Sequence, residues 1–244
     1  MKKILILSFY YQPDLCAGSF RATALVKSLS KTDLNLDIEV ITTVPNRYSS
    51  FREKVEVFEV VDGVRIHRIA IPMHNSGMFD QSLAFISYYR QAMKIAKKSD
   101  YDLVFATSSR LFTAFLGARI ARKKRVALYL DIRDIFVDTI SDILPKALGI
   151  LSVSWLNLIE RYTFSTAKHI NFVSEGFLRY FEEKKIDASF SFFTNGIDKE
   201  FNDITNTISY ETPSDKKLTI LYAGNIGQGQ GLHKIIPALA RRLG

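Results

Sequence analysis

The stretch Lys3–Phe9, KILILSF, is followed by the loop Tyr10–Ser19, YYQPDLCAGS, and then by Phe20–Ser30, FRATALVKSLS. The first stretch is a short apolar run of the kind that forms a buried strand. The third carries apolar residues at three- and four-residue spacing, which is typical of an amphipathic helix. The chain therefore begins with a predicted strand, loop and helix.

The same unit recurs along the chain, and this alternation predicts an α/β fold with a parallel sheet and helices on both faces. The expected strands are Lys3–Phe9, Asp37–Thr43, Tyr101–Thr107, Arg125–Leu130, His169–Val173, Phe190–Phe193 and Leu218–Tyr222. The expected helices are Phe20–Ser30, Phe79–Lys97, Leu111–Arg122, Pro145–Thr166, Glu175–Lys185 and Leu232–Leu243.

One segment departs from the parallel pattern. Val55–Val61 and Val64–Ile71 flank Asp62-Gly63, a dipeptide that suits a two-residue hairpin turn. We therefore expect an antiparallel hairpin at an edge of the sheet.

Domain boundaries follow from a polar, aperiodic stretch, Asp198–Lys217. We expect a first domain over residues 1–200, a linker over 201–216, and the first strand and helix of a second domain over 217–244. One strand and one helix cannot bury a core alone. The second domain is therefore expected to be incomplete in this chain.

Composition narrows the class of protein. Of the 244 residues 47% are hydrophobic and 24% charged, which excludes a disordered or collagen-like chain. The one cysteine, Cys16, cannot form an internal disulfide, and no metal-binding spacing of Cys or His is present, so we expect a reducing, cytoplasmic location and no metal. The longest uncharged apolar stretch, Ala147–Ile159, is shorter than the roughly 18 residues of a membrane span.

Polar residues follow several predicted strands, at the rim where ligands bind in open parallel sheets. A glycine and a serine at a helix N-terminus present backbone N–H groups suited to a phosphate. The candidate substrate-binding residues at this rim are Gly18, Ser19, Arg21, Ser108, Ser174, Glu175 and Asn195. Structural alternatives stay open: Ser19 and Ser174 as helix N-caps, and Asn195-Gly196 as a turn that needs a positive φ.

Asp131, Arg133 and Asp134 directly follow a buried-looking strand. Partly buried charges are costly unless they are paired or used, so these three residues are the candidate catalytic groups. The alternative is an internal salt bridge between Arg133 and one of the carboxylates.

A second anion site is predicted near the end of the chain. The loop Tyr222–Gly231 contains four glycines between a predicted strand and a helix, which lets the backbone approach a pyrophosphate closely. The candidate diphosphate-binding residues are Gly224, Asn225, Gly227 and Gln230.

Together these pieces resemble the N-terminal part of a retaining glycosyltransferase of family 4, of the GT-B type with two facing Rossmann-like domains. The likeness is greatest to bacterial aminosugar transferases of surface-polysaccharide assembly, such as those of O-antigen and capsule. The matching segments are Tyr10–Asp14 with Gly18, Ser19 and Arg21, then Asp62–Arg68, Asp131–Asp134, Phe172–Glu175, Asn195–Asp198 and Tyr222–Gly227.

The resemblance implies a nucleotide-sugar donor as substrate, a glycan or polyprenyl-linked acceptor, no cofactor, and sugar transfer with retained anomeric configuration. The chain departs from the family in lacking a histidine before Asp131, and in carrying Asn225 and Gln230 where many members have arginine and lysine. The family's paired glutamates would lie beyond Gly244. We therefore expect the chain alone to be inactive; the alternative is a non-catalytic binding half that a partner chain completes.

The charge balance favours an anionic partner, since 33 Lys and Arg against 25 Asp and Glu give a net charge of +8. No pattern of stacking aromatics supports nucleic acid. A basic run instead predicts peripheral attachment to the anionic inner face of the cytoplasmic membrane, helped by Trp155 and Leu158 on the helix from Pro145. The run is Arg119, Arg122, Lys123, Lys124 and Arg125.

Overall fold

A single sheet of eight strands organises the first 196 residues, in the spatial order β3-β4-β2-β1-β5-β6-β7-β8. The computed structural model describes residues 1–46, 54–72, 78–108, 111–134, 146–197, 221–224 and 231–243. The strands are β1 (Lys2–Leu7), β2 (Leu36–Thr43), β3 (Phe58–Val61), β4 (Val64–Ile69), β5 (Leu103–Ser108), β6 (Ala127–Ile132), β7 (His169–Phe172) and β8 (Ser189–Phe192). All neighbouring pairs are parallel except β3 with β4.

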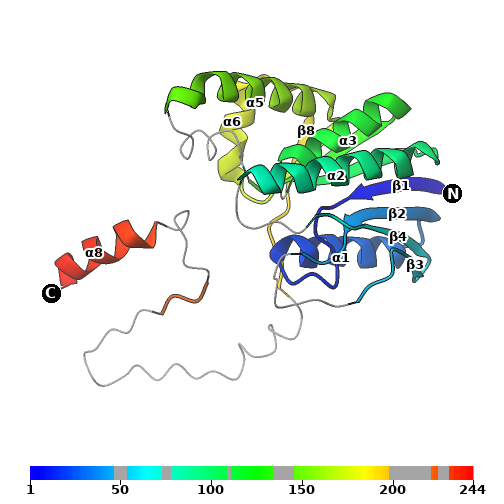
Figure 1. The fold of residues 1–244 in the computed structure, drawn as a ribbon, viewed down its shortest axis with the longest axis horizontal. Helices are drawn as coiled ribbons and strands as arrows, with labels where there is room; N and C mark the ends of the chain where they lie inside the picture. Colours follow the sequence, from blue (N-terminus) through cyan, green and yellow to red (C-terminus); the bar gives the residue numbers. More distant parts are fainter. Residues whose placement is uncertain are drawn as a thin grey trace. The chain divides into compact units, whose positions relative to one another are not determined.

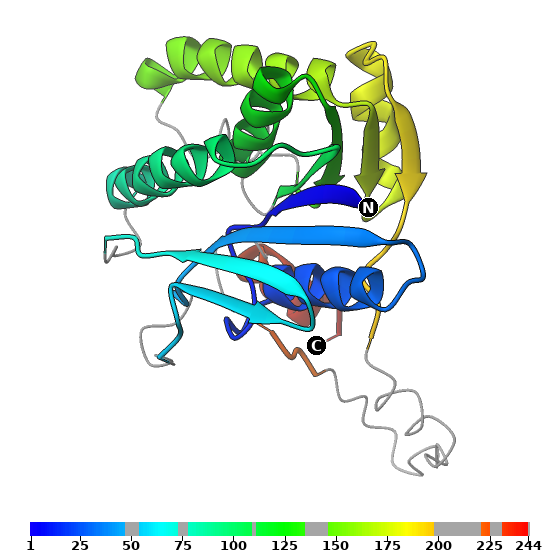
Figure 2. The same cartoon turned by 90° about the vertical axis from the view of Figure 1, so that its right-hand side faces the viewer.

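Helices cover both faces of this sheet, as the alternating pattern predicted (Figure 1). They are α1 (Ala17–Ser30), α2 (Met78–Lys97), α3 (Leu111–Lys124), α5 (Lys146–Thr166) and α6 (Leu178–Glu183), with a short 3-10 helix η1 (Glu175–Phe177) before α6. Helix α1 lies on one face, while α2, α3 and α5 lie on the other (Figure 2). The predicted helix Glu175–Lys185 is thus two short elements.

The side chains of the central strand β1 explain why both faces are covered. Leu5 and Leu7 belong to the core cluster under α2 and α3, whereas Ile4 and Ile6 belong to the cluster under α1. Successive side chains of a strand point to opposite faces, so a continuous apolar run is buried only between two layers.

The edge hairpin is confirmed. Asp62 and Gly63 have φ angles of 51° and 77°, the positive values that a tight two-residue turn requires. Val61 therefore pairs with Val64, and β3 forms the antiparallel edge of the sheet.

The second unit, Ile197–Gly244, contains helix α8 (Leu232–Leu243). The predicted linker, residues 201–216, and most of the predicted strand 218–222 lie outside the described residues. Helix α8 is amphipathic and exposes Ile235, Ile236 and Leu239.

Helix α3 approaches the sheet closely at Gly117. A Cβ atom on this glycine would lie 2.7 Å from the Cβ of Ala106 on β5 and 3.3 Å from a Cδ atom of Leu128 on β6. Contacts between real Cβ atoms and other heavy atoms are rarely this short, so the position requires glycine.

We expect Gly117→Ala to lower the free energy of unfolding by about 1 kcal/mol. Overpacking of about 1–3 kcal/mol outweighs a gain in helix propensity of about 1 kcal/mol. Urea unfolding measures the change. The control is Gly196→Ala, since a Cβ at Gly196 has nothing within 4 Å. A Gly117→Ala variant as stable as the parent would contradict the packing argument.

Candidate functional site

The candidate site lies at the rim formed by the carboxyl ends of the parallel strands. Asp131 lies at the end of β6 and is buried, although it is a charged residue in an otherwise apolar strand. Its carboxylate is stabilised by Arg21 from the first half of α1, a helix that follows β1.

Arg21 and Asp131 form a bidentate ion pair, referred to below as the Arg21–Asp131 pair. Arg21 donates from Nε to Oδ2 of Asp131 at 2.8 Å and from Nη2 to Oδ1 at 2.9 Å. The hydrogen bond to Asp131 raises the pKa of Arg21 above its ordinary value. Bidentate charge-assisted pairs of this kind are the strong ones.

The remaining donors of Arg21 reach the segment that leaves β8. Nη2 donates to the carbonyl oxygen of Phe193 at 2.9 Å, and Nη1 donates to the carbonyl oxygen of Thr194 at 2.9 Å and to Oδ1 of Asn195 at 3.4 Å. A guanidinium has five N–H groups, and these five contacts match that number. The predicted role of Arg21 in substrate binding stays a prediction, and in this structure its donors serve the protein itself.

Asn171 on β7 completes the network, and sequence reasoning missed it. Its amide nitrogen donates to Oδ1 of Asp131 at 2.7 Å, while its Oδ1 accepts from Oγ of Ser191 and from the backbone N–H of Phe193, both at 3.0 Å. The available signal was a buried asparagine within the short apolar strand HINF.

The start of α1 corrects one expectation. The helix begins at Ala17 with Cys16 as its N-cap, so the prediction of Ser19 as N-cap is wrong. Ser19 lies in the first turn and is buried, and its Oγ has no hydrogen-bond partner among the described residues. The first intrahelical bond is from Phe20 to Cys16, which leaves the N–H groups of Gly18 and Ser19 without intrahelical acceptors.

The loop after β6 corrects a second expectation. Arg133 forms no ion pair with Asp131 or Asp134, so the salt-bridge alternative is wrong, and Asp131 pairs with Arg21 instead. Ser108 at the end of β5 accepts a hydrogen bond from the backbone N–H of Arg133 at 3.1 Å. Nε of Arg133 is buried and has no partner within the described part of the chain. Partial desolvation raises the pKa of Asp134 above its ordinary value, and the nearby Arg133 opposes the shift.

The structural alternatives for Ser174 and for Asn195-Gly196 have different outcomes. Ser174 is the N-cap of η1, since its Oγ accepts from the N–H of Gly176 at 3.2 Å, and this prediction is confirmed. Glu175 is exposed in the first position of that turn. The φ of Gly196 does not lie in the positive region, so the turn predicted for Asn195-Gly196 is wrong. Asn195 is held by Arg21 instead.

The predicted diphosphate residues belong to the second unit. Gly224 is exposed, and Asn225, Gly227 and Gln230 lie outside the described residues. Within the described ranges, no three His, Cys, Asp or Glu side chains are grouped so that they share a metal ion.

The family follows from comparison with known proteins. The family described as "Glycosyl transferase 4-like domain" matches residues 20–193, which is most of the chain and includes Arg21, Asp131 and Asn171. This chain belongs to that family. Among curated protein sequences no match is found.

Solved structures agree with the fold. Sucrose-phosphate synthase from Thermosynechococcus elongatus superposes with a TM-score of 0.52 at 10% identity, over 81% of this chain and 49% of that one. A shorter chain of the same enzyme superposes with a TM-score of 0.53 at 9% identity, over 84% of this chain and 94% of that one. Anabaena HepE, in complex with UDP and glucose, gives 0.44 at 14% identity, over 81% and 45%. The chain thus has a GT-B, Rossmann-like fold and spans about half the length of the full-length synthase.

A double-mutant cycle measures how much the Arg21–Asp131 pair contributes to stability. We expect Asp131→Ala to lower the free energy of unfolding by about 3 kcal/mol, because it leaves a largely buried guanidinium without its partner. The cycle with Arg21→Ala is expected to give a coupling energy of about 1–3 kcal/mol, measured by urea unfolding.

The matched control for this cycle is an exposed pair on α6, in which Nε of Arg179 lies 3.1 Å from Oε1 of Glu183. Exposed pairs of this kind contribute about 0.5 kcal/mol or less. Equal coupling energies in the two cycles would show that the Arg21–Asp131 pair stabilises the protein no more than an exposed pair does.

Proposed function

We propose that this chain is the acceptor-side part of a glycosyltransferase that moves a sugar from a nucleotide-diphosphate donor to a glycan or lipid-linked acceptor in cell-surface polysaccharide biosynthesis. The family and the GT-B fold support transfer of a sugar. The retaining course, the polysaccharide role and the nucleotide-sugar donor are part of the proposal.

The observation that carries the proposal is a set of unused donors at the strand ends. The N–H groups of Gly18 and Ser19 have no intrahelical acceptor, and Nε of Arg133 has no partner among the described residues. Arg21 in α1 pairs with Asp131 near the end of β6, so the start of α1 and the loop after β6 lie at one rim. Donors fixed in this way suit an anionic group.

The chemistry proposed at this rim is electrostatic. Transfer of a sugar from a nucleotide-diphosphate donor breaks the bond between the anomeric carbon and the diphosphate oxygen, forms a bond to the acceptor oxygen and releases the nucleoside diphosphate. Preorganised donors stabilise the charge that develops on this leaving group. The cationic Arg133 and the N-terminus of α1 are suited to that task. Asp134, with its raised pKa, is suited to exchange a proton with an acceptor hydroxyl. The second domain is proposed to hold the donor, with its diphosphate bound through Gly224, Asn225, Gly227 and Gln230.

We expect Arg133→Ala to lower kcat/KM for sugar transfer by about tenfold or more, measured in a chain that also carries a complete second domain. Thermal stability should stay unchanged, because the guanidinium has no ion-pair partner among the described residues. The measurement is product formation from nucleotide sugars with a polyprenyl-diphosphate acceptor.

The matched control is Arg125→Ala, since Arg125 is exposed in the turn before β6, at the opposite end of that strand. Its turnover should stay within about threefold of the parent. Unchanged turnover in Arg133→Ala, or a fall in both variants alike, would remove Arg133 from the active site.

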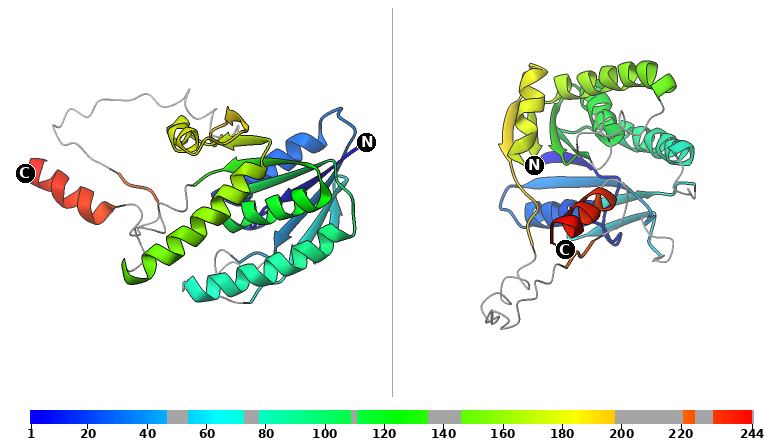
Figure 3. Two further views of the ribbon diagram at one scale, coloured as in Figure 1. Left: turned by 90° about the horizontal axis from the view of Figure 1, so that it is seen from above. Right: turned by 90° about the vertical axis from the view of Figure 1, so that its left-hand side faces the viewer.

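Membrane attachment is the second part of the proposal. No helix among the described residues is both long and apolar enough to cross a bilayer. Helices α2, α3 and α5 lie alongside one another over the sheet (Figure 3), and Trp155 and Leu158 of α5 are exposed on their outer side. Exposed aromatic and aliphatic side chains beside cations are suited to a membrane interface.

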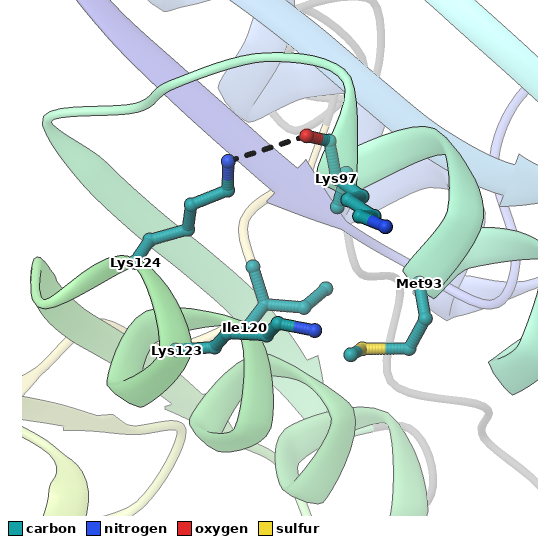
Figure 4. Close-up of a pocket in the computed structure, with 6 residues that line it drawn as sticks. Met93, Lys97, Ile120, Lys123 and Lys124 are labelled. Carbon is teal, nitrogen blue, oxygen red and sulfur yellow. Dashed lines mark hydrogen bonds between the residues drawn. The ribbon is translucent and has the colours of Figure 1, made fainter.

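The basic residues at the end of α3 are only partly available. Lys97, Lys123 and Lys124 line a cavity of about 120 Å³ between α2 and α3, together with Met93 and Ile120 (Figure 4). Lys124 donates to the carbonyl oxygen of Lys97 and pairs with Asp100. Arg122 lies over the ring of Tyr162. We therefore propose Lys123 and Arg122 as the cations that meet lipid phosphates, and Lys124 as a structural residue.

We expect Arg122→Glu combined with Lys123→Glu to abolish sedimentation with vesicles of acidic lipid at low salt. Each cation removed weakens membrane binding by about 1 kcal/mol. The control is Lys27→Glu combined with Lys31→Glu, which makes the same charge change at exposed positions of α1 and the turn after it. Equal losses in both double variants would indicate a response to net charge alone. Binding to neutral vesicles would contradict the electrostatic proposal.

A further inference from the structure

The edge strand β3 is an unusual surface for a protein in water. Its apolar side chains are exposed on both faces of the sheet: Val57 at 67%, Phe58 at 50%, Val60 at 58% and Val61 at 45%. The segment Val55–Val61 contains no lysine or proline, the residues with which proteins commonly protect such edges.

The hydrogen-bonding groups of this edge can be assigned from the hairpin. The carbonyl oxygen of Val57 accepts from the N–H of Arg68 at 2.8 Å, so Val57 faces β4 with its backbone groups. Backbone direction alternates along a strand. Phe58 and Val60 therefore point their N–H and C=O groups outward, away from the sheet.

We propose that β3 pairs antiparallel with β3 of a second copy of this chain, about a two-fold axis at Phe58. This register places Phe58 opposite its own counterpart and Val55 opposite Val61 of the partner copy. It also brings Lys54, which precedes the strand, toward Asp62 in the turn of the other copy, and opposite charges that face each other in this way are favourable.

Neighbouring registers are worse. An axis at Glu59 brings two glutamates directly opposite each other, which is destabilising. An axis at Val60 pairs the apolar Phe58 with the charged Asp62 and leaves Lys54 without an acidic partner. The charge pattern of residues 54–62 therefore selects Phe58 as the centre.

One internal contact supports the pairing. The most polar side chain of the strand, Glu59, is held by Arg68 of its own chain, which is buried. Its charge is thus compensated before association. What remains at the edge is apolar side chains and the outward backbone groups, a combination that favours strand addition.

Sedimentation equilibrium of the full chain tests the association. We expect a monomer–dimer equilibrium that Val60→Lys weakens by about tenfold or more. The control is Leu34→Lys, the same kind of change at an exposed apolar residue in the turn before β2. A monomer at all concentrations, or equal weakening by both variants, would overturn the proposal. Circular dichroism establishes that each variant is folded.

Cross-linking tests the register. In a Cys16→Ser background, Phe58→Cys should form an intermolecular disulfide on mild oxidation, because the two copies of residue 58 face each other. Val60→Cys should cross-link much more slowly, since its partner is Glu56 of the other copy. Faster cross-linking of Val60→Cys, or no cross-linking of Phe58→Cys, would overturn the proposed pairing.

Discussion

The ion pair between Arg21 and Asp131 joins parts of the chain that the sequence keeps far apart. A buried carboxylate at the end of a strand is unstable without a cation and hydrogen-bond donors, and here it has both in Arg21 and Asn171. The same guanidinium also holds the backbone at Phe193 and Thr194. Four segments therefore share one electrostatic centre: α1, β6, β7 and the chain after β8.

This centre divides the rim into two kinds of residue. Arg21, Asp131 and Asn195 have partners within the protein, and their donors and acceptors determine where the loops lie. Nε of Arg133 has no partner among the described residues, and the N–H groups of Gly18 and Ser19 have no intrahelical acceptor. The residues that hold the loops in place are thus not the residues proposed to meet an anion, and substitutions can separate the two.

The layers of the fold could be predicted from the sequence because they depend on local patterns. The run KILIL, the three- and four-residue spacing in α1 and the Asp62-Gly63 turn each indicate their structure within a few residues. The partners of Arg21 lie more than 100 positions away, and no local pattern encodes such a pairing. For the same reason the alternative of a salt bridge between Arg133 and a neighbouring carboxylate is wrong, and Asn171 gives no signal among apolar residues.

The hairpin reverses the chain at the end of the sheet, and this reversal bears on the symmetry of any assembly that uses the edge. Two identical antiparallel edges that meet about a two-fold axis satisfy each other and close the point group. A head-to-tail contact, in which the edge meets a different strand of the next molecule, leaves one edge open at every step and grows into a filament. A short self-complementary edge strand thus offers the molecule an assembly that ends at two copies.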